Sequence, residues 1–135
     1  MYKPEDYLNT QQKSKLGFGA MRLPDDNITS KMVDAFLDAG CNYFDTAYIY
    51  EGSEEQLKRT LVKRHPRESY LMANKLPPWH VHAPGDREKI FKESLKRTGL
   101  DYFDFYLVHS LDDGSEESTY KAELFEWCLD RKSVV

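Results

Sequence analysis

The chain has 135 residues, of which 40% are hydrophobic and 31% charged, a balance typical of one globular domain rather than a disordered or fibrous chain. Nineteen basic and twenty-three acidic residues give a net charge of −4, and no basic stripe could neutralise a row of phosphates, which argues against nucleic acid as a partner. No apolar run reaches the roughly 18 residues needed to cross a bilayer, and the N-terminus has no apolar signal core, so we expect a cytoplasmic protein.

Short β-rich runs alternate along the chain with longer helical patterns, which indicates βα units on a parallel sheet. The first strand is predicted at residues 16–21. A polar stretch then leads into a helix near residues 31–39, and Gly40 provides a natural stop after it. The second strand is predicted at residues 42–46.

The second helix is predicted from a capping-box pattern over residues 53–56, and it runs to about Arg64. The His-Pro sequence that follows breaks this helix. The third strand is predicted at residues 70–74 and ends in Lys75, after which two prolines enforce a loop.

Asp86 is predicted to cap the third helix, which Gly99 ends. The fourth strand covers residues 103–108, and Asp104 is expected near its start with a backbone or basic partner. A fourth helix is predicted through residues 124–131, after a polar loop. The charge-dense second and third helices are expected to present ordinary solvated outer faces.

Neither the cysteines nor the histidines predict a metal site. Cys41 and Cys128 lie far apart and form no CxxC pair, so both are expected to be partly buried apolar positions rather than zinc ligands or a disulfide. His80 and His82 form an HxH pair like that of metal-dependent barrel hydrolases, but prolines surround it and favour a loop. Solvated histidines or a substrate-facing lid are therefore the preferred interpretations.

Reactive side chains follow three of the predicted strands: Asp45 ends the second strand, Lys75 the third and His109 the fourth. Active sites of parallel α/β barrels collect at the carboxyl ends of the strands, so these groups are expected on one rim. Tyr50 follows Asp45 by five residues, in a loop short enough to fold back over that rim. Each residue alone could be a solvated loop residue or a locally paired ion, but coincidence at three successive strands favours a site.

These four residue types suit the reduction of a carbonyl. An ammonium within a few ångströms lowers the pKa of a phenol and makes its proton transferable. An aspartate beside the lysine keeps the ammonium charged and in place, and an imidazole can hydrogen-bond the carbonyl and orient it. Such a site stabilises a developing alkoxide but supplies no electrons, so it requires a hydride donor.

Four runs of the sequence share their order and spacing with one known family. They are LGFGAMRLP, NYFDTAYIYEGSEEQLK, LMANKLP and LKRTGLDYFDFYLVHSL. By these runs residues 14–131 resemble aldo-keto reductases, and the DTAxxY element with a downstream SE is fairly specific. The resemblance implies an α/β fold that is the N-terminal half of a (β/α)8 TIM barrel, with about four βα units and parallel strands. It also implies a single partial domain over residues 1–135.

The resemblance implies an NAD(P)H-dependent oxidoreductase that reduces an aldehyde or ketone to an alcohol. The family's catalytic tetrad falls on Asp45, Tyr50, Lys75 and His109. Tyr50 would be the general acid, and Lys75 would modulate its acidity. Asp45 would pair with Lys75 and contact the nicotinamide ribose. His109 would orient the carbonyl.

Three further residues gain an interpretation from the resemblance. Met21 and Arg22 match family positions near the cofactor, which would be NADPH or NADH. Trp79 could line a pocket for a small carbonyl substrate, as loop aromatics of the family do, or could cap the barrel rim. No metal is implied.

The chain also departs from the family pattern. A complete barrel has eight βα units and about 250 residues, including the phosphate-binding loops after strands seven and eight. The runs LGFGAMRLP and NKLPPWH resemble a prokaryotic branch that often carries a C-terminal iron-sulfur module, but no cysteine cluster is present, so no cluster is expected. The ending RKSVV suggests a truncated or frameshifted reading frame.

Two hypotheses follow for a half-barrel with open sheet edges. Two copies could complete an eight-stranded barrel as a homodimer. Alternatively, the chain is a catalytically silent fragment or an interaction module that cannot hold the cofactor alone.

Overall fold

The computed structural model describes residues 13–111 together with residues 123, 124, 126 and 127. Four strands form one sheet in the order β1-β2-β3-β4, and each neighbouring pair is parallel. The strands are β1 (Gly17–Gly19), β2 (Tyr43–Asp45), β3 (Leu71–Leu76) and β4 (Phe105–Val108). Parallel strands that are consecutive in sequence need a crossover between them, and the helices supply it.

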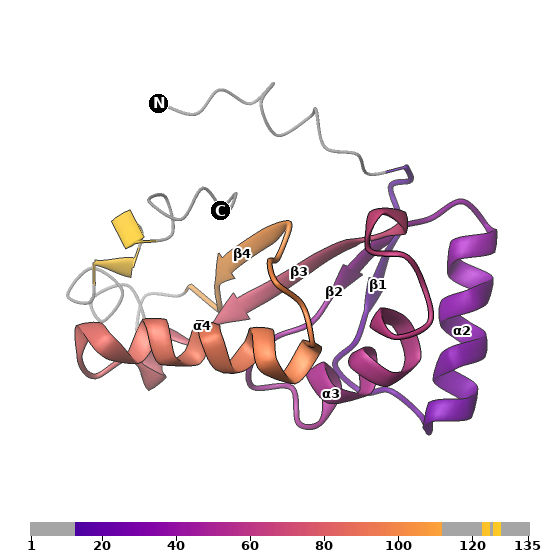
Figure 1. The fold of residues 1–135 in the computed structure, drawn as a ribbon. Helices are drawn as coiled ribbons and strands as arrows, with labels where there is room; N and C mark the ends of the chain where they lie inside the picture. The colour runs from indigo at the N-terminus through magenta and orange to yellow at the C-terminus, as the bar shows by residue number, and fades with distance from the viewer. Residues whose placement is uncertain (1–12, 112–122, 125, 128–135) are drawn as a thin grey trace.

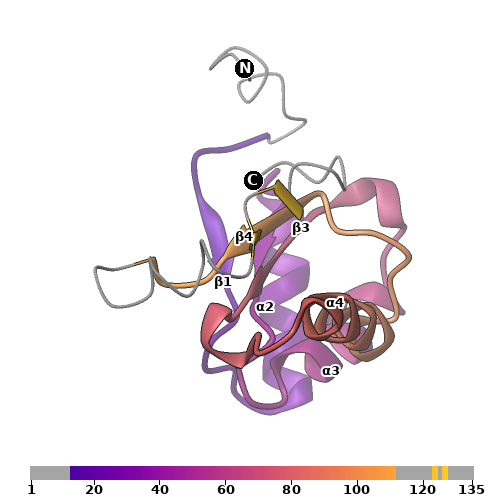
Figure 2. The ribbon, with the colours of Figure 1, turned by 90° about the vertical axis from the view of Figure 1, so that its left-hand side faces the viewer.

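Each crossover contains one α-helix. The helices are α2 (Asp26–Asp38), α3 (Ser53–Leu57), which continues as the π-helical turn η1 (Lys58–Val62), and α4 (Pro84–Thr98). The 3-10 turns η2 (Arg67–Ser69) and η3 (Pro78–His80) flank β3. All three α-helices lie on one side of the sheet, as two views show (Figure 1, Figure 2). The predicted α/β fold with parallel strands and alternating helices is confirmed for the described residues.

The core lies between the sheet and these helices. Phe18, Phe44 and Met72 stand side by side in the strand register, and each is at least nine-tenths buried. Phe36 of α2 packs edge-on against the rings of Phe18 and Phe44, at centroid distances of 5.5 and 5.1 Å. Because side chains alternate along a strand, the residues next to these three face the other side of the sheet.

Two glycines end helices as predicted. Gly40 has φ +79° and Gly99 has φ +72°, values in the left-handed region that an L side chain adopts only with strain. At Gly99 a Cβ atom would also lie 2.9 Å from Cε of Lys58. Both positions therefore favour glycine, which has no side chain.

The helix starts are where the predictions were wrong. Helix α2 begins at Asp26 rather than near residue 31, because the Asp25 carboxylate accepts the N–H groups of Asn27 and Ile28 and caps the helix at once. The polar stretch that was expected to be a loop is the first turn of this helix.

The capping prediction for α3 was wrong, whereas Asp86 does cap α4, but from the third position of the helix rather than from the residue before it. Gly52 precedes α3, and Ser53 is its first residue and makes no capping bond. Asp86 lies inside the first turn of α4 and accepts the N–H groups of His82 and Ala83 from there. Its carboxylate thus stabilises the helix start without occupying the cap position.

The predicted fourth helix lies largely outside the described residues. Within them, Leu124 and Trp127 are buried, and the Trp127 ring lies 5.9 Å from the ring of Phe91 and 6.1 Å from that of Tyr106. No helix in the part of the chain that is described is long and apolar enough to cross a membrane.

Asp104 lies at the amino end of the sheet, one residue before β4, with both kinds of partner that were predicted. Its Oδ2 atom accepts the N–H of Met72 at 2.7 Å and a guanidinium N–H of Arg67 at 2.6 Å. Side-chain exposures of 17% for Asp104 and 23% for Arg67 leave little water to replace either bond. The carboxylate therefore joins the start of β3 to the start of β4.

We predict that Asp104→Ala lowers the free energy of unfolding by about 2 kcal/mol, because two charge-assisted hydrogen bonds are lost at a partly buried site. Urea unfolding followed by circular dichroism measures the loss. Asp101→Ala is the matched control, since Asp101 is an exposed carboxylate three residues away. Equal stability of the two variants would contradict the prediction.

Candidate active site

Three of the predicted site residues lie at the carboxyl ends of neighbouring strands. Asp45 is the last residue of β2, Lys75 is next to last in β3, and His109 follows β4 directly. The register pairs Asp45 with Ala73, two residues before Lys75. Asp45 and Lys75 therefore share one face of the sheet, opposite the helices, with the lysine diagonally beyond the carboxylate.

Lys75 is held at two points by β2 and its loop. Its Nζ atom donates to Asp45 Oδ2 at 2.6 Å and to the carbonyl oxygen of Thr46 at 2.8 Å. The lysine side chain is 15% exposed, so these acceptors rather than water provide its hydrogen-bond partners. The ammonium is consequently fixed in position as well as paired.

The loop between β2 and α3 brings Tyr50 back to this ammonium. The Tyr50 N–H donates to the Ala47 carbonyl at 3.1 Å, and the Tyr50 carbonyl accepts from Ser53 N–H at 3.0 Å, so two tight turns shape the loop. The phenol oxygen lies 3.5 Å from Lys75 Nζ, which in turn lies 4.9 Å from the ring centroid. Tyr50 thus presents its hydroxyl to the lysine, as the sequence predicted.

His109 completes the group from β4. Its ring lies edge-on to that of Tyr50 at 5.6 Å and next to the Trp79 ring, also at 5.6 Å. The residue is 9% exposed. Burial lowers the pKa of His109, the positive charge of Lys75 lowers it further, and Asp45 partly opposes both. The imidazole is therefore neutral near pH 7.

The neutral ring has a preferred tautomer. Nδ1 of His109 is buried and has no hydrogen-bond partner among the described residues. A buried N–H without an acceptor is costly, so the contacts of the described residues favour the tautomer with its proton on Nε2. His109 can then donate one hydrogen bond from Nε2 to an acceptor at the rim.

The remaining predicted residues lie at the edge of this group. Met21 and Arg22 follow β1 and are exposed, next to Ala20, whose N–H donates to the Asp45 carbonyl at 2.9 Å. Trp79, for which two interpretations were open, packs on His109 and is 42% exposed. An indole in this place can contact a ligand beside the imidazole.

Ser53 has a role that the sequence analysis missed. Its hydroxyl donates to the carbonyl of Ala20 at 2.6 Å and lies 2.8 Å from the hydroxyl of Thr46. Instead of capping α3, it ties the chain after β1 to the chain after β2. No sequence signal separates this use from a capping box, because the spacing is the same.

Glu54 contradicts the expectation of a solvated helix face. It is 1% exposed, and its carboxylate binds Asn74 and Arg97. Its spacing of three and seven residues from the buried Leu57 and Leu61 places it on the inner stripe of the helix. That spacing is the signal that could have identified it.

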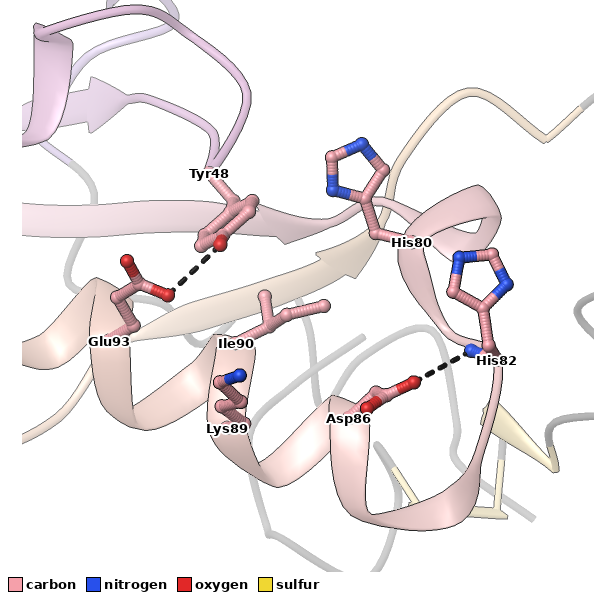
Figure 3. Close-up of a pocket in the computed structure, with 7 residues that line it drawn as sticks. All are labelled: Tyr48, His80, His82, Asp86, Lys89, Ile90 and Glu93. Carbon is pink, nitrogen blue, oxygen red and sulfur yellow. Dashed lines mark hydrogen bonds between the residues drawn. The ribbon is translucent and has the colours of Figure 1, made fainter.

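The HxH pair lies on the loop after β3, as expected, and lines a pocket with Tyr48, Asp86 and Glu93 (Figure 3). In this pocket the Tyr48 hydroxyl donates to Glu93 at 2.9 Å. The part of the chain with described coordinates contains no group of three or more ligands arranged for a metal ion. Tyr48 and Tyr50, two residues apart, thus face different neighbours: α4 and the Lys75 ammonium.

Comparison with known proteins decides the family. The family model described as "Aldo/keto reductase family" matches residues 15–126. The chain belongs to the aldo-keto reductase family. A curated aldo-keto reductase from Mycolicibacterium paratuberculosis is 38% identical over 108 residues, which cover 78% of this chain and 37% of that protein.

Solved aldo-keto reductases confirm the predicted half-barrel. A putative family member from Pseudomonas aeruginosa superposes with TM-score 0.70 and 28% identity, over 87% of this chain and 51% of its own. One from Klebsiella pneumoniae, solved in complex with NADPH, superposes with TM-score 0.59 and 25% identity, over 81% of this chain and 41% of its own. The chain thus spans about half the length, or less, of the aldo-keto reductases it matches.

We predict that Lys75→Met raises the pKa of His109, because the lysine charge that disfavours the imidazolium is removed while the burial remains. Histidine Cε1–H signals followed by NMR against pH measure the change. Lys89→Met, an exposed lysine on α4, should leave the titration unchanged. An unaltered His109 midpoint in Lys75→Met would contradict the electrostatic coupling.

Proposed function

We propose that this chain carries the carbonyl-reducing site of an aldo-keto reductase, with Asp45, Tyr50, Lys75 and His109 as its catalytic residues. The observation that carries the proposal is the position of one ammonium, 2.6 Å from a carboxylate and 3.5 Å from a phenol oxygen. A neutral imidazole packs against the same phenol ring. An aldehyde or ketone placed among these groups meets two donors at its oxygen.

The rim residues fit a nicotinamide cofactor, NADPH or NADH. Lys75 binds one oxygen of the Asp45 carboxylate, whose side chain is 32% exposed, so the other oxygen can accept from a ribose hydroxyl. The exposed side chains of Met21 and Arg22 follow the neighbouring strand and would lie beside the cofactor. When bound, the reduced nicotinamide supplies the hydride.

The chain's own residues then orient the carbonyl and donate the proton to its oxygen. Nε2–H of His109 donates to the carbonyl oxygen and orients it. Tyr50 gives its phenolic proton to that oxygen as negative charge develops there. Lys75 stabilises the resulting phenolate, and Asp45 keeps the ammonium in place. Trp79 beside His109 provides an apolar wall that excludes water.

We predict that Tyr50→Phe lowers the rate of NADPH oxidation with 4-nitrobenzaldehyde by about 100-fold or more, because the general acid is removed. Absorbance at the reduced-nicotinamide band measures the rate. Tyr102→Phe is the matched control, since Tyr102 is an exposed tyrosine at the opposite end of the sheet.

Each outcome of this assay has a meaning. Turnover that survives in Tyr50→Phe would contradict the proposed chemistry. Absent turnover in the unaltered chain, with no change of Trp79 or Trp127 fluorescence on addition of NADPH, would instead favour the alternative of an interaction module that does not hold the cofactor.

We further propose that two copies of the chain associate through their sheets. Among the described residues β1 pairs only with β2 and β4 only with β3, so neither outer strand has a second strand partner there, and an unpaired strand edge favours association with another chain. Tyr43 and Phe105, whose rings lie 5.3 Å apart on the face opposite the helices, remain partly exposed. Eight strands close a barrel of this type, and two copies supply that number.

Size-exclusion chromatography with light scattering tests this association. We expect twice the mass of the chain at micromolar concentration. Phe105→Lys should shift the protein toward the monomer, because it buries a charge in the proposed contact, whereas the exposed Tyr102→Lys should not. A monomer for the unaltered chain would rule the dimer out.

A further inference from the structure

Arg97, in the last turn of α4, contacts the loop that carries Tyr50. One guanidinium nitrogen, Nη1, donates to the Tyr48 carbonyl at 3.4 Å, and the guanidinium carbon lies 4.6 Å from the centre of the Tyr48 ring. The other, Nη2, binds Glu93 at 2.5 Å, and Glu93 also accepts the Tyr48 hydroxyl (Figure 3). Tyr48 therefore contacts α4 through its backbone carbonyl, its ring and its hydroxyl.

The same guanidinium reaches the strand that carries Lys75. Nη1 of Arg97 donates to Glu54 Oε2 at 3.2 Å, and Glu54 Oε1 accepts from Asn74 Nδ2 at 2.8 Å. The Asn74 side-chain oxygen accepts the Lys75 N–H at 2.7 Å. Three side chains thus form a continuous hydrogen-bonded path from α4 to the backbone of Lys75.

A third contact joins the Tyr50 loop directly to β3. The Tyr48 N–H donates to the Lys75 carbonyl at 3.4 Å. Strand β3 and the Tyr50 loop therefore touch each other directly, and Arg97 binds both. The position of the Tyr50 phenol relative to the Lys75 ammonium depends on these two backbones.

The burial of this path distinguishes it from the surface ion pairs of the molecule. Glu54 is 1% exposed and Asn74 is fully buried. In the pair of Arg59 with Asp26, by contrast, both side chains are about half exposed, at 52% and 46%. A buried carboxylate must be matched by its partners, and a buried ion pair is better suited to select one arrangement than to add stability.

We propose that Arg97 and Glu54 are positioning residues of the reductase site, which hold the Tyr50 loop and the Lys75 strand at the separation that proton transfer needs. Neither residue touches the reacting atoms. The inference rests on the proposed function for its catalytic meaning, but the geometry that it predicts is measurable without turnover.

The test uses His109 as a reporter of the Tyr50 ring. Tyr50, Trp79, Lys75 and Asp45 surround His109, and the pKa of its imidazole is lowered chiefly by burial. Displacement of the Tyr50 ring would admit water and raise that pKa. We therefore expect Arg97→Met to shift the NMR titration midpoint of His109 upward, and Arg59→Met, which breaks the exposed ion pair, to leave it unchanged.

Two more variants keep the test decisive if Arg97→Met fails to fold. Arg97→Lys keeps the charge but cannot bind Tyr48, Glu54 and Glu93 at once, and it should give a smaller upward shift. The double variant Glu54→Gln with Arg97→Met removes both charges together, so no buried carboxylate is left unpaired, and it should show the full shift.

Kinetics provide the second readout. In a chain that turns over, Arg97→Met should lower kcat by about 10- to 100-fold with little change in KM, the pattern expected for misplaced catalytic groups. A folded Arg97→Met or double variant whose His109 titrates as in the unaltered chain overturns the positioning role. Turnover that survives in Tyr50→Phe overturns only the reductase proposal.

Discussion

The contact between the Lys75 ammonium and the Asp45 carboxylate is the constraint on which the site depends. At 2.6 Å it joins two neighbouring strands on the face of the sheet opposite the helices. The ammonium is largely buried, and a carboxylate and a backbone carbonyl bind it in place of water. Tyr50 and His109 gather around this fixed charge, and the proposed chemistry needs it in that place.

Two consecutive residues of β3, Asn74 and Lys75, make contacts on opposite faces of the sheet. Lys75 faces the rim, whereas Asn74 points to the helices and binds the buried Glu54. The alternation of side chains along a strand makes this division unavoidable. It connects the helical layer, through Asn74, to the backbone of the residue that faces the rim.

Hydrogen bonds fix the loops at the rim from several directions. Ser53 ties the chain after β1 to the chain after β2, and Arg97 ties the Tyr50 loop to α4. Preorganisation of this kind matters for a general acid, since proton transfer requires heavy atoms within hydrogen-bond reach. The part of the aldo-keto reductase barrel present in this chain is thus the part that carries the proposed proton-transfer residues.

Local pattern was sufficient for the strands, the two helix-ending glycines and the residues at the strand ends. Apolar runs and the glycines after helices depend on neighbours in sequence, so they predicted the parallel α/β fold and the rim position of Asp45, Lys75 and His109. The half-barrel followed from the family resemblance that the DTAxxY element and the other runs carry. Only the tertiary structure decided the roles of Ser53, Glu54 and Arg97. Their partners lie 33, 20 and 49 residues away in the chain, and such pairing is set by how α3 and α4 pack on the sheet. A charged residue on a helix looks the same in sequence whether it meets water or a buried asparagine.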